Sequence, residues 1–320
     1  MSHLLEVQGL TTAFSADYGE TVSVDHISFH VDEGETVCIV GESGCGKSVT
    51  SLSIMGLLGR GGAVTDGSVL FDGKNLLALS EKELDEIRGN RISMIFQDPL
   101  TSLNPVFTIG SQITESIRTH LKLGRQEAEA RAEKILSQVG MPDAHAAMKK
   151  YPHTLSGGMR QRAMIAMALS CHPALLIADE PTTALDVTIQ AQIMSLLKEL
   201  KKEIGMSLIL ITHDIGLVAS MADRVLVMYA GQIIEEAPVK ELFAFPRHPY
   251  TKALLATVPS IYDGPDRELV SIPGIDPENY DSIPGCRFAD RCALRRPECD
   301  RPQEDRQIGE GRRVRCICGG

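Results

Sequence analysis

The segment GESGCGKS at residues 41–48 constrains the fold of this chain more than any other feature. It fits the pattern G-x-x-x-x-G-K-[ST] without departure. A continuous apolar run at residues 36–40, typical of a buried parallel strand, precedes it, and a helix-compatible run follows it. Glycines here let backbone N–H groups surround phosphate oxygens at a helix N-terminus, where the helix dipole is positive. The sequence therefore predicts a phosphate-binding loop rather than an ordinary glycine-rich turn.

Two side chains of this loop have predicted roles in nucleotide chemistry. We expect Lys47 to neutralise charge on the β- and γ-phosphates, and Ser48 to supply a hydroxyl to Mg²⁺. Cys45 lies at the predicted helix start, where a thiol pKa can fall, although we favour a small residue at a position free to vary. The predicted nucleotide contacts in this segment are Gly41, Glu42, Ser43, Gly44, Cys45, Gly46, Lys47, Ser48 and Val49.

Apolar strands alternate with a helix further along the chain. Residues 174–179 (ALLIAD) and 207–212 (SLILIT) have the pattern of buried strands, and residues 187–202 that of a helix. This alternation predicts an α/β fold with a parallel sheet packed between helices. The block at residues 98–151 has helical periodicity instead, so we expect a helical insertion within the α/β domain.

Charged side chains follow both predicted strands. Asp179 and Glu180 end the first, and His213 ends the second. Ligands of open parallel sheets bind outside the carboxyl ends of the strands. Asp179 suits the shell of Mg²⁺, and Glu180 suits a general base or water-orienting group for attack on the γ-phosphate. A lone histidine is more often structural, but the matching strand-end position predicts that His213 reaches the same phosphate.

A second anion-binding helix start is predicted in LSGGMRQR at residues 155–162, where Ser156 precedes Gly157 and Gly158. With this segment in view, the sequence resembles the ATP-binding subunit of an ABC transporter. GESGCGKS, LSGGMRQR, the strand LLIADE and the histidine of ITHD occur in that family's order and at compatible spacing. The resemblance implies a P-loop NTPase ABC ATPase domain at residues 1–240, with a helical subdomain inserted at about 98–165.

The resemblance implies roles for further residues. Gln97, in FQDP, matches the loop that senses the Mg²⁺–water site and the membrane subunit. Asp186, in ALD, matches the loop that crosses to the partner ATPase. Tyr18, 23 residues before Gly41, is placed like the aromatic that stacks on adenine; such stacking is worth about 1–3 kcal/mol. Phe14 is the alternative to Tyr18. If neither contacts adenine, we expect the aromatic to be a buried residue of the core. The candidate catalytic residues are then Lys47, Gln97, Glu180 and His213, and the candidate Mg²⁺ ligands are Ser48, Gln97 and Asp179.

In the resembled family, two ATPase subunits enclose two ATP molecules head to tail. Ser156, Gly157 and Gly158 would then bind the γ-phosphate held by the partner's loop. The implied partners are a second ABC ATPase, expected to be a paralogue, two membrane-spanning permease subunits and, indirectly, an extracytoplasmic solute-binding protein. Since all motifs are intact, we expect the chain's own phosphate-loop site to hydrolyse ATP.

The composition disfavours a protein whose main role is binding nucleic acid, and it favours one without a membrane span. Lys and Arg number 32 against 42 Asp and Glu, giving a formal charge of −10. Protein surfaces that bind the phosphate backbone of nucleic acids are usually basic. The sequence contains no run of 18 apolar residues, and its first residues lack a basic region with a long apolar core. We therefore expect neither a membrane span nor a signal peptide, and a cytoplasmic chain. The resemblance to an ABC transporter subunit implies a peripheral location at the cytoplasmic face of the cell membrane.

After about residue 240 the composition shifts to repeated prolines and clustered cysteines, with too few apolar residues for an independent core. Residues 247–255 (RHPYTKALL) and 284–292 (PGCRFADRC) are similar to the extension of oligopeptide and dipeptide importer ATPases, and FQDPLTSLNP at 96–105 is typical of that subfamily. This implies a loop-rich extension at residues 241–320 and ATP-driven peptide import. Import of nickel or another small solute is the alternative.

Five of the eight cysteines lie in the last 35 residues, which in a reducing compartment favours metal ligation over disulfides. The spacing C-x5-C-x6-C-x16-C suits Zn²⁺ or a four-iron cluster, but lacks the tight C-x₂₋₄-C pairs usual for zinc. Some members of the resembled subfamily carry an iron–sulfur cluster at this position, so we favour [4Fe-4S] over Zn²⁺. Cys318 could replace Cys316 as the fourth ligand. The alternative to metal binding is that these cysteines are free thiols. The expected ligands are Cys286, Cys292, Cys299 and Cys316.

Two other classes of function compete with the transporter. A soluble ABC-type ATPase of DNA repair or translation generally has two cassettes, a long coiled-coil insertion or a basic surface, and this chain has one cassette and net negative charge. A redox or sensor protein with a secondary ATPase is disfavoured because the set of catalytic motifs is complete.

Overall fold

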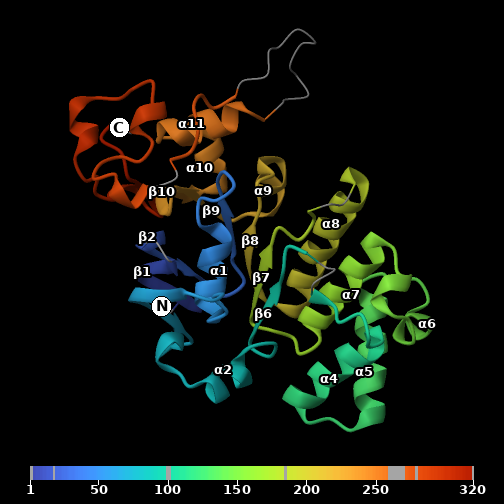
Figure 1. The fold of residues 1–320 in the computed structure, drawn as a ribbon. Coiled ribbons are helices and arrows are strands. Elements are labelled where there is room, and N and C mark those ends of the chain that lie inside the picture. The colour runs from blue at the N-terminus through green and yellow to red at the C-terminus, as the bar shows by residue number, and fades with distance from the viewer. Residues whose placement is uncertain are drawn as a thin grey trace. The chain divides into compact units, whose positions relative to one another are not determined.

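The computed structural model describes residues 3–16, 19–98, 102–183, 186–258, 271–277 and 280–318 (Figure 1). The chain divides into two compact units. The first comprises Met1–Val31, Thr36–Leu77 and Ile211–Gly320, and the second comprises Asp32–Glu35 and Ala78–Leu210. Each unit is described in turn.

The first unit contains an antiparallel sheet with the strand order β2-β1-β4-β5. Its strands are β1 (Leu5–Ala16), β2 (Gly19–Val31), β4 (Gly62–Phe71) and β5 (Lys74–Asn75). β1 pairs with β2 from Leu5 opposite Val31 onward, and both of these residues are fully buried. The sheet therefore has one face against the core, which fixes its register.

The same unit carries strands of a second sheet. β3 (Thr36–Val40) runs parallel to β9 (Arg224–Tyr229), which is followed in order by β10 (Gln232–Pro238), β12 (Arg312–Val314) and β11 (Arg306–Gly309). All residues of β3 are buried, as its apolar run predicts. The helices of this unit are α1 (Lys47–Met55), α9 (Ile215–Met221), α10 (Val239–Ala244) and α11 (Pro249–Ala256), with single 3-10 turns at Tyr280–Ser282, Ala289–Arg291 and Pro297–Asp300.

The C-terminal extension packs on the strands of this unit through an aromatic cluster. Tyr229 of β9, Tyr250 of α11 and Phe288 are all buried. Their ring centroids lie 4.6 Å apart for Tyr229 and Tyr250, and 5.4 Å apart from Phe288 to each tyrosine. Edge-on aromatic pairs at these distances are favourable beyond their buried area. The extension thus shares an apolar interior with β9, as expected of a segment with few apolar residues of its own.

The second unit combines strands with most of the helices. β6 (Ile92–Ile95) runs parallel to β7 (Leu175–Asp179), and β8 (Ser207–Ile211) neighbours β7, with only Ile211 assigned to the first unit. The apolar runs predicted at residues 174–179 and 207–212 therefore form strands, as expected. The helices are α2 (Glu81–Ile87), α4 (Ile109–Leu121), α5 (Arg125–Gln138), α6 (Ala144–Met148), α7 (Gly157–Leu169) and α8 (Val187–Ile204).

Helices α4, α5 and α6 lie together, as Figure 1 shows, and they occupy the block in which helical periodicity predicts an insertion. The predicted apolar face of α5 is buried at Ala132, Ile135 and Leu136. α8 runs two residues beyond the predicted segment and stops at Gly205, whose φ of 76° provides a left-handed cap. Among the described residues, no helix is both long enough and apolar enough to cross a membrane.

Candidate functional site

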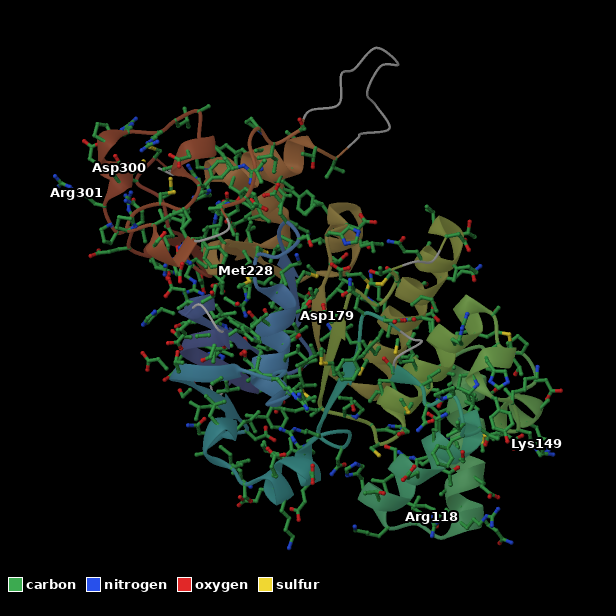
Figure 2. All side chains as sticks on the ribbon, in the orientation of Figure 1. Arg118, Lys149, Asp179, Met228, Asp300 and Arg301 are labelled. Atoms are coloured by element: carbon green, nitrogen blue, oxygen red, sulfur yellow. The ribbon has the colours of Figure 1, made fainter. Side chains whose placement is uncertain are left out.

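The predicted phosphate loop connects β3 to α1 in the first unit. α1 begins at Lys47, and Gly46 before it has a φ of 102°. A Cβ atom on Gly46 would lie 2.6 Å from the backbone oxygen of Ser23, and one on Gly41 would collide with the backbone oxygen of Met228, labelled in Figure 2. Both glycines are therefore required by close approach of the backbone, and the loop is wrapped tightly against β2 and β9.

Lys47 is buried and folds back over its own loop. Its Nζ donates to the backbone oxygens of Gly41, at 2.9 Å, and Glu42, at 2.8 Å. A buried ammonium held by neutral carbonyls leaves net positive charge inside the loop, which is the charge that phosphate binding needs. Burial raises the pKa of the neighbouring Cys45 thiol to about 11. The lowering that a helix start would cause is therefore outweighed by burial.

His213 lies at the same edge of the first unit as the loop. The N–H of Thr212 donates to the backbone oxygen of Ile39 at 3.3 Å, which aligns the residue before His213 with the strand that ends in the loop. His213 is exposed, and Asp214 next to it caps α9 by accepting from the N–H of Gly216 at 2.9 Å. The structure thus brings His213 and the loop to one edge of this unit.

In the second unit, Gln97 and Glu180 come together. Asp179, labelled in Figure 2, is the buried last residue of β7, and Glu180 follows it with a φ of 45°, a left-handed conformation that non-glycine residues rarely adopt. Glu180 Oε2 accepts from Gln97 Nε2 at 3.0 Å and from Thr183 Oγ1 at 2.9 Å. Such a conformation is costly and is found preferentially at functional sites.

Two predicted phosphate and partner contacts are helix caps of the same unit. Ser156 caps α7 by accepting from the N–H of Met159 at 3.4 Å, so Gly157 and Gly158 form the first turn with their N–H groups at the helix start. Asp186 caps α8 by accepting from the N–H of Ile189 at 3.0 Å. Of the adenine candidates, Tyr18 lies outside the described residues, and Phe14 is half-buried on β1 opposite Thr21.

The clustered cysteines gather around Cys286 in the first unit. Burial, together with the nearby thiols of Cys316, Cys299 and Cys292, raises the pKa of the Cys286 thiol to about 11. The N–H of Cys286 also donates to the backbone oxygen of Cys299 at 2.8 Å. Cys318 is close as well, because its N–H donates to Cys316 Sγ at 3.3 Å. The cysteines of the described residues are all free thiols.

Two residues that touch the phosphate loop have no role assigned by the sequence patterns. Tyr250 accepts from the N–H of Glu42, and Arg291 forms an ion pair with the Glu42 carboxylate. They lie 208 and 249 positions from Glu42, so no local spacing reveals the contacts. Their segments resemble a subfamily pattern in the sequence, which marks the stretch without indicating what each residue does.

Comparisons with known proteins agree with this geometry. The family model described as "ABC transporter" matches residues 24–183, and the model described as "Oligopeptide/dipeptide transporter, C-terminal region" matches residues 234–299. The oligopeptide transport ATP-binding protein AppD of Bacillus subtilis is 52% identical over 319 residues, covering 99% of this chain and 97% of that protein. The dipeptide transport ATP-binding protein DppD of the same organism is 53% identical over 302 residues, covering 94% and 90%.

Solved structures show the same fold. The dimeric structure of MJ0796, a bacterial ABC transporter cassette, aligns with a TM-score of 0.66 and 29% identity over 73% of this chain and 98% of that chain. CbiO1 from Clostridium perfringens, part of an ABC transporter complex, aligns with a TM-score of 0.64 and 32% identity over 76% and 92%. The chain therefore belongs to the ABC transporter ATPases, in the group that carries the oligopeptide/dipeptide transporter C-terminal region.

Proposed function

We propose that this ABC ATPase powers the import of di- and oligopeptides across the cytoplasmic membrane. The observation that carries the proposal is a complete ATPase motif set joined, in one chain, to an extension of the oligopeptide/dipeptide type. The relatives named above are peptide transport ATP-binding proteins that match over nearly their whole length. The chain acts at the cytoplasmic face of the membrane, with a second ATPase subunit and two permease subunits.

ATP binds at residues 41–49 in this proposal. Backbone N–H groups of the loop and Lys47 hold the β- and γ-phosphates, while Ser156, Gly157 and Gly158 hold the γ-phosphate of the partner subunit's nucleotide. Asp186, at the start of α8, contacts the partner. Closure of the pair on ATP and its opening after hydrolysis drive the permease through contacts made only with the γ-phosphate.

Glu180 is the proposed general base. Its carboxylate takes up a proton from the attacking water, and Gln97 and Thr183 hold it in place through the hydrogen bonds described above. His213 contacts the γ-phosphate. The oxygen donors Ser48, Gln97 and Asp179 are of the kind that Mg²⁺ prefers, and a bound Mg²⁺ supplies charge neutralisation on the phosphates.

The test of the ATPase mechanism is Glu180→Gln in the assembled transporter. The substitution keeps the shape and removes the base, so we expect ATP turnover to fall at least about a hundredfold with ATP binding retained. Glu199→Gln is a matched control, because Glu199 lies on α8 and bonds only locally, to Ser195 at 3.2 Å. Turnover of the Glu180 variant equal to that of the control excludes Glu180 as the base.

The test of peptide import uses proteoliposomes that contain the complex co-purified with this chain. We expect labelled di- and oligopeptides to accumulate with ATP hydrolysis when the matching solute-binding protein is present. Accumulation of Ni²⁺ and not of peptides would assign the chain to the nickel branch instead. Absence of permease subunits from the co-purified material would contradict the transporter assignment.

We also propose that Cys286, Cys292, Cys299 and Cys316 hold a [4Fe-4S] cluster. The support is that the thiols surrounding Cys286 are the three others of the set that the sequence spacing selects. Iron and zinc both bind cysteine as the thiolate, so these four residues supply donors suited to either metal. When bound, the cluster cross-links the extension; Zn²⁺ is the alternative occupant, and Cys318 the alternative fourth ligand.

Anaerobic purification distinguishes these occupants. We expect visible absorbance together with about four iron and four sulfide per chain, and its loss in Cys299→Ser. Cys171→Ser is the matched control, because Cys171 is also a buried thiol but lies in the second unit. One zinc per chain without iron would overturn the cluster.

A further inference from the structure

Arg291 of the extension reaches the phosphate loop through a bidentate ion pair. It ends the 3-10 turn Ala289–Arg291, directly before Cys292, and its side chain is only 7% exposed. Nη1 donates to Glu42 Oε2 at 2.8 Å, and Nη2 donates to Glu42 Oε1 at 3.1 Å. Two parallel charge-assisted hydrogen bonds of this kind fix orientation as well as adding energy.

The guanidinium of Arg291 is itself held in position. Its Nε donates to the backbone oxygen of Pro273 at 2.8 Å, and Nη1 also contacts Asp276 and the hydroxyl of Tyr229, the latter at 3.3 Å. Burial and the neighbouring Glu42 carboxylate raise the pKa of Asp276 to about 6. Burial also disfavours charge on Glu42, but Arg291 outweighs it and holds the Glu42 pKa below its ordinary value. Arg291 thus pairs with two carboxylates, and it is bidentate to Glu42.

Glu42 is anchored at its backbone as well as its side chain. Its N–H donates to the hydroxyl of Tyr250 at 2.9 Å, and its carbonyl accepts from Lys47 Nζ at 2.8 Å. Tyr250 is fully buried in the aromatic cluster with Tyr229 and Phe288. The extension therefore fixes the second residue of the loop at two points, and the catalytic lysine bonds to that same residue.

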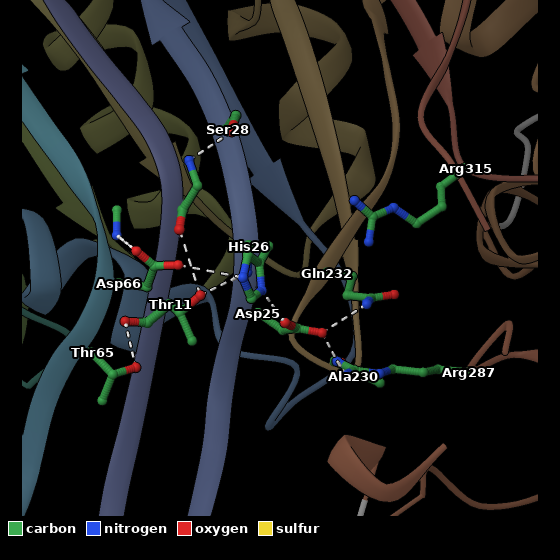
Figure 3. Close-up of polar contacts among 12 residues, drawn as sticks. Thr11, Asp25, His26, Ser28, Thr65, Asp66, Ala230, Gln232, Arg287 and Arg315 are labelled. Carbon is green, nitrogen blue, oxygen red and sulfur yellow. Dashed lines mark hydrogen bonds and ion pairs between the residues drawn. The ribbon is translucent and has the colours of Figure 1, made fainter. Parts of the chain in front are cut away.

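A second arginine of the same short segment also holds the ATPase domain. Arg287, directly after Cys286, pairs with Asp25 of β2 at 2.6 Å and donates to the backbone oxygen of Ala230; Figure 3 shows Asp25 between Arg287 and Gln232. The segment from Cys286 to Cys292 thus has a cysteine at each end and, beside each cysteine, an arginine bound to the ATPase domain.

We propose that Arg291 is a positioning residue for ATP binding: through Glu42 it holds the phosphate loop in its binding conformation, so that the extension sets the affinity of the subunit for ATP. The proposal rests on the assignment of residues 41–48 as the phosphate loop. Backbone N–H groups bind phosphate well only if they already point at it, and a loop freed at Glu42 must be ordered when ATP binds. We expect the effect on binding, because the contacts described for Arg291 are to Glu42, Pro273, Asp276 and Tyr229, which have no proposed part in hydrolysis.

The experiment measures the affinity of the full-length chain for MgATP by isothermal titration calorimetry. The variants are Arg291→Gln, Glu42→Gln and their double variant, with thermal melting as a check of folding. Arg295→Gln is the matched control. Arg295 is another arginine of the extension, but its ion pairs are with Asp290 and, at 2.9 Å, with Asp300, both of which also lie in the extension. Lys47→Ala tests the phosphate-loop assignment separately.

We expect Arg291→Gln and Glu42→Gln each to weaken MgATP binding about tenfold, and the double variant to be no weaker than either, because both remove the same pair. In the assembled transporter, Arg291→Gln should raise the KM for ATP while kcat stays within about twofold. Glu42→Gln keeps the size of the side chain and removes the same ion pair. It therefore tests whether the pair affects ATP affinity if Arg291→Gln does not fold.

Affinities of both single variants equal to that of Arg295→Gln, with binding abolished in Lys47→Ala, would overturn the role of Arg291 while the ATP site stands. Additive losses in the double variant would also overturn it, since the two residues would then act separately. Binding retained in Lys47→Ala would instead contradict the phosphate-loop assignment itself.

Discussion

Gln97 donates its side-chain amide to Glu180 Oε2 at 3.0 Å, across 83 positions of sequence. The pair joins the second residue after β6 with the first residue after β7, two parallel neighbouring strands. A neutral amide beside a carboxylate orients it without adding charge, whereas a second carboxylate would raise the pKa of the pair.

Gln97→Glu should therefore shift the pH dependence of ATP turnover. With two carboxylates in contact, one holds a proton at neutral pH, so the proposed base Glu180 is partly blocked and turnover recovers only as the pH rises. We expect the acidic limb of the kcat profile to move up by at least about one pH unit. Gln97→Ala is the control, since it removes the hydrogen bond without adding a charge; an identical acidic limb in Gln97→Glu and Gln97→Ala would contradict the prediction.

Gly158→Ala should disturb the start of α7 through a single contact. A Cβ atom there would lie 3.2 Å from Ile189 Cγ2 on α8, tighter than normal packing. We expect a loss of about 1–3 kcal/mol of stability and a matching fall in ATP turnover, both largely restored by adding Ile189→Ala. Melting curves and turnover of the single and double variants measure this.

Gly124→Ala is the control for that substitution, because a Cβ atom on Gly124 would meet open space in the same unit. A double variant that regains stability but not turnover would show that Gly158 is needed for phosphate contact as well as for packing.

The sequence predicts the elements around the site well, because these depend on local pattern. The apolar run before the phosphate loop is β3, the run before Asp179 is β7, and Gly205 ends the helix α8 close to its expected end. A strand that is buried along its whole length has a continuous run of apolar residues, and a helix that ends in a left-handed cap usually has glycine there. Both features can be recognised in the local sequence.

The contacts between these elements could not be predicted in the same way. Arg291 and Tyr250 meet Glu42 only because the extension returns to the loop after more than 200 residues, and an arginine in a loop-rich segment looks like a solvated charge. Likewise, the sequence does not reveal the left-handed φ of Glu180, because glutamate rarely adopts this conformation. Long-range packing decides both.

Stability of the first unit should fall with decreasing pH because of His248. Burial lowers the pKa of this side chain to about 3 from 6.5, and its Nδ1 accepts from the N–H of Tyr250 at 3.0 Å, which requires the neutral ring. A base with a lowered folded pKa contributes stability that is complete above the unfolded pKa and is lost as the pH falls toward the folded one. Between pH 7 and pH 5 the loss should be about 2 kcal/mol.

His248→Asn should remove this part of the pH dependence, because an asparagine oxygen can accept the same N–H without titrating. Melting temperatures measured every half unit from pH 7 to pH 5 give the comparison. An equal fall in the wild-type and variant chains would assign the pH dependence to other groups.

The contributions of Arg287 and Asp25 to the free energy of unfolding should be coupled. The Arg287 side chain is 6% exposed, packs over the Tyr280 ring at 5.1 Å, and pairs with Asp25, whose carboxylate also accepts from Gln232 Nε2 at 2.9 Å. Arg287→Met leaves a half-buried carboxylate without its cation, so we expect a loss of about 2–4 kcal/mol. Asp25→Asn in that background should recover part of the loss, because the remaining amide carries no charge to compensate. Melting of the four chains of the cycle measures the coupling. If the double variant loses the sum of the two single losses, the two residues are not coupled, and the pair does not hold the extension to β2.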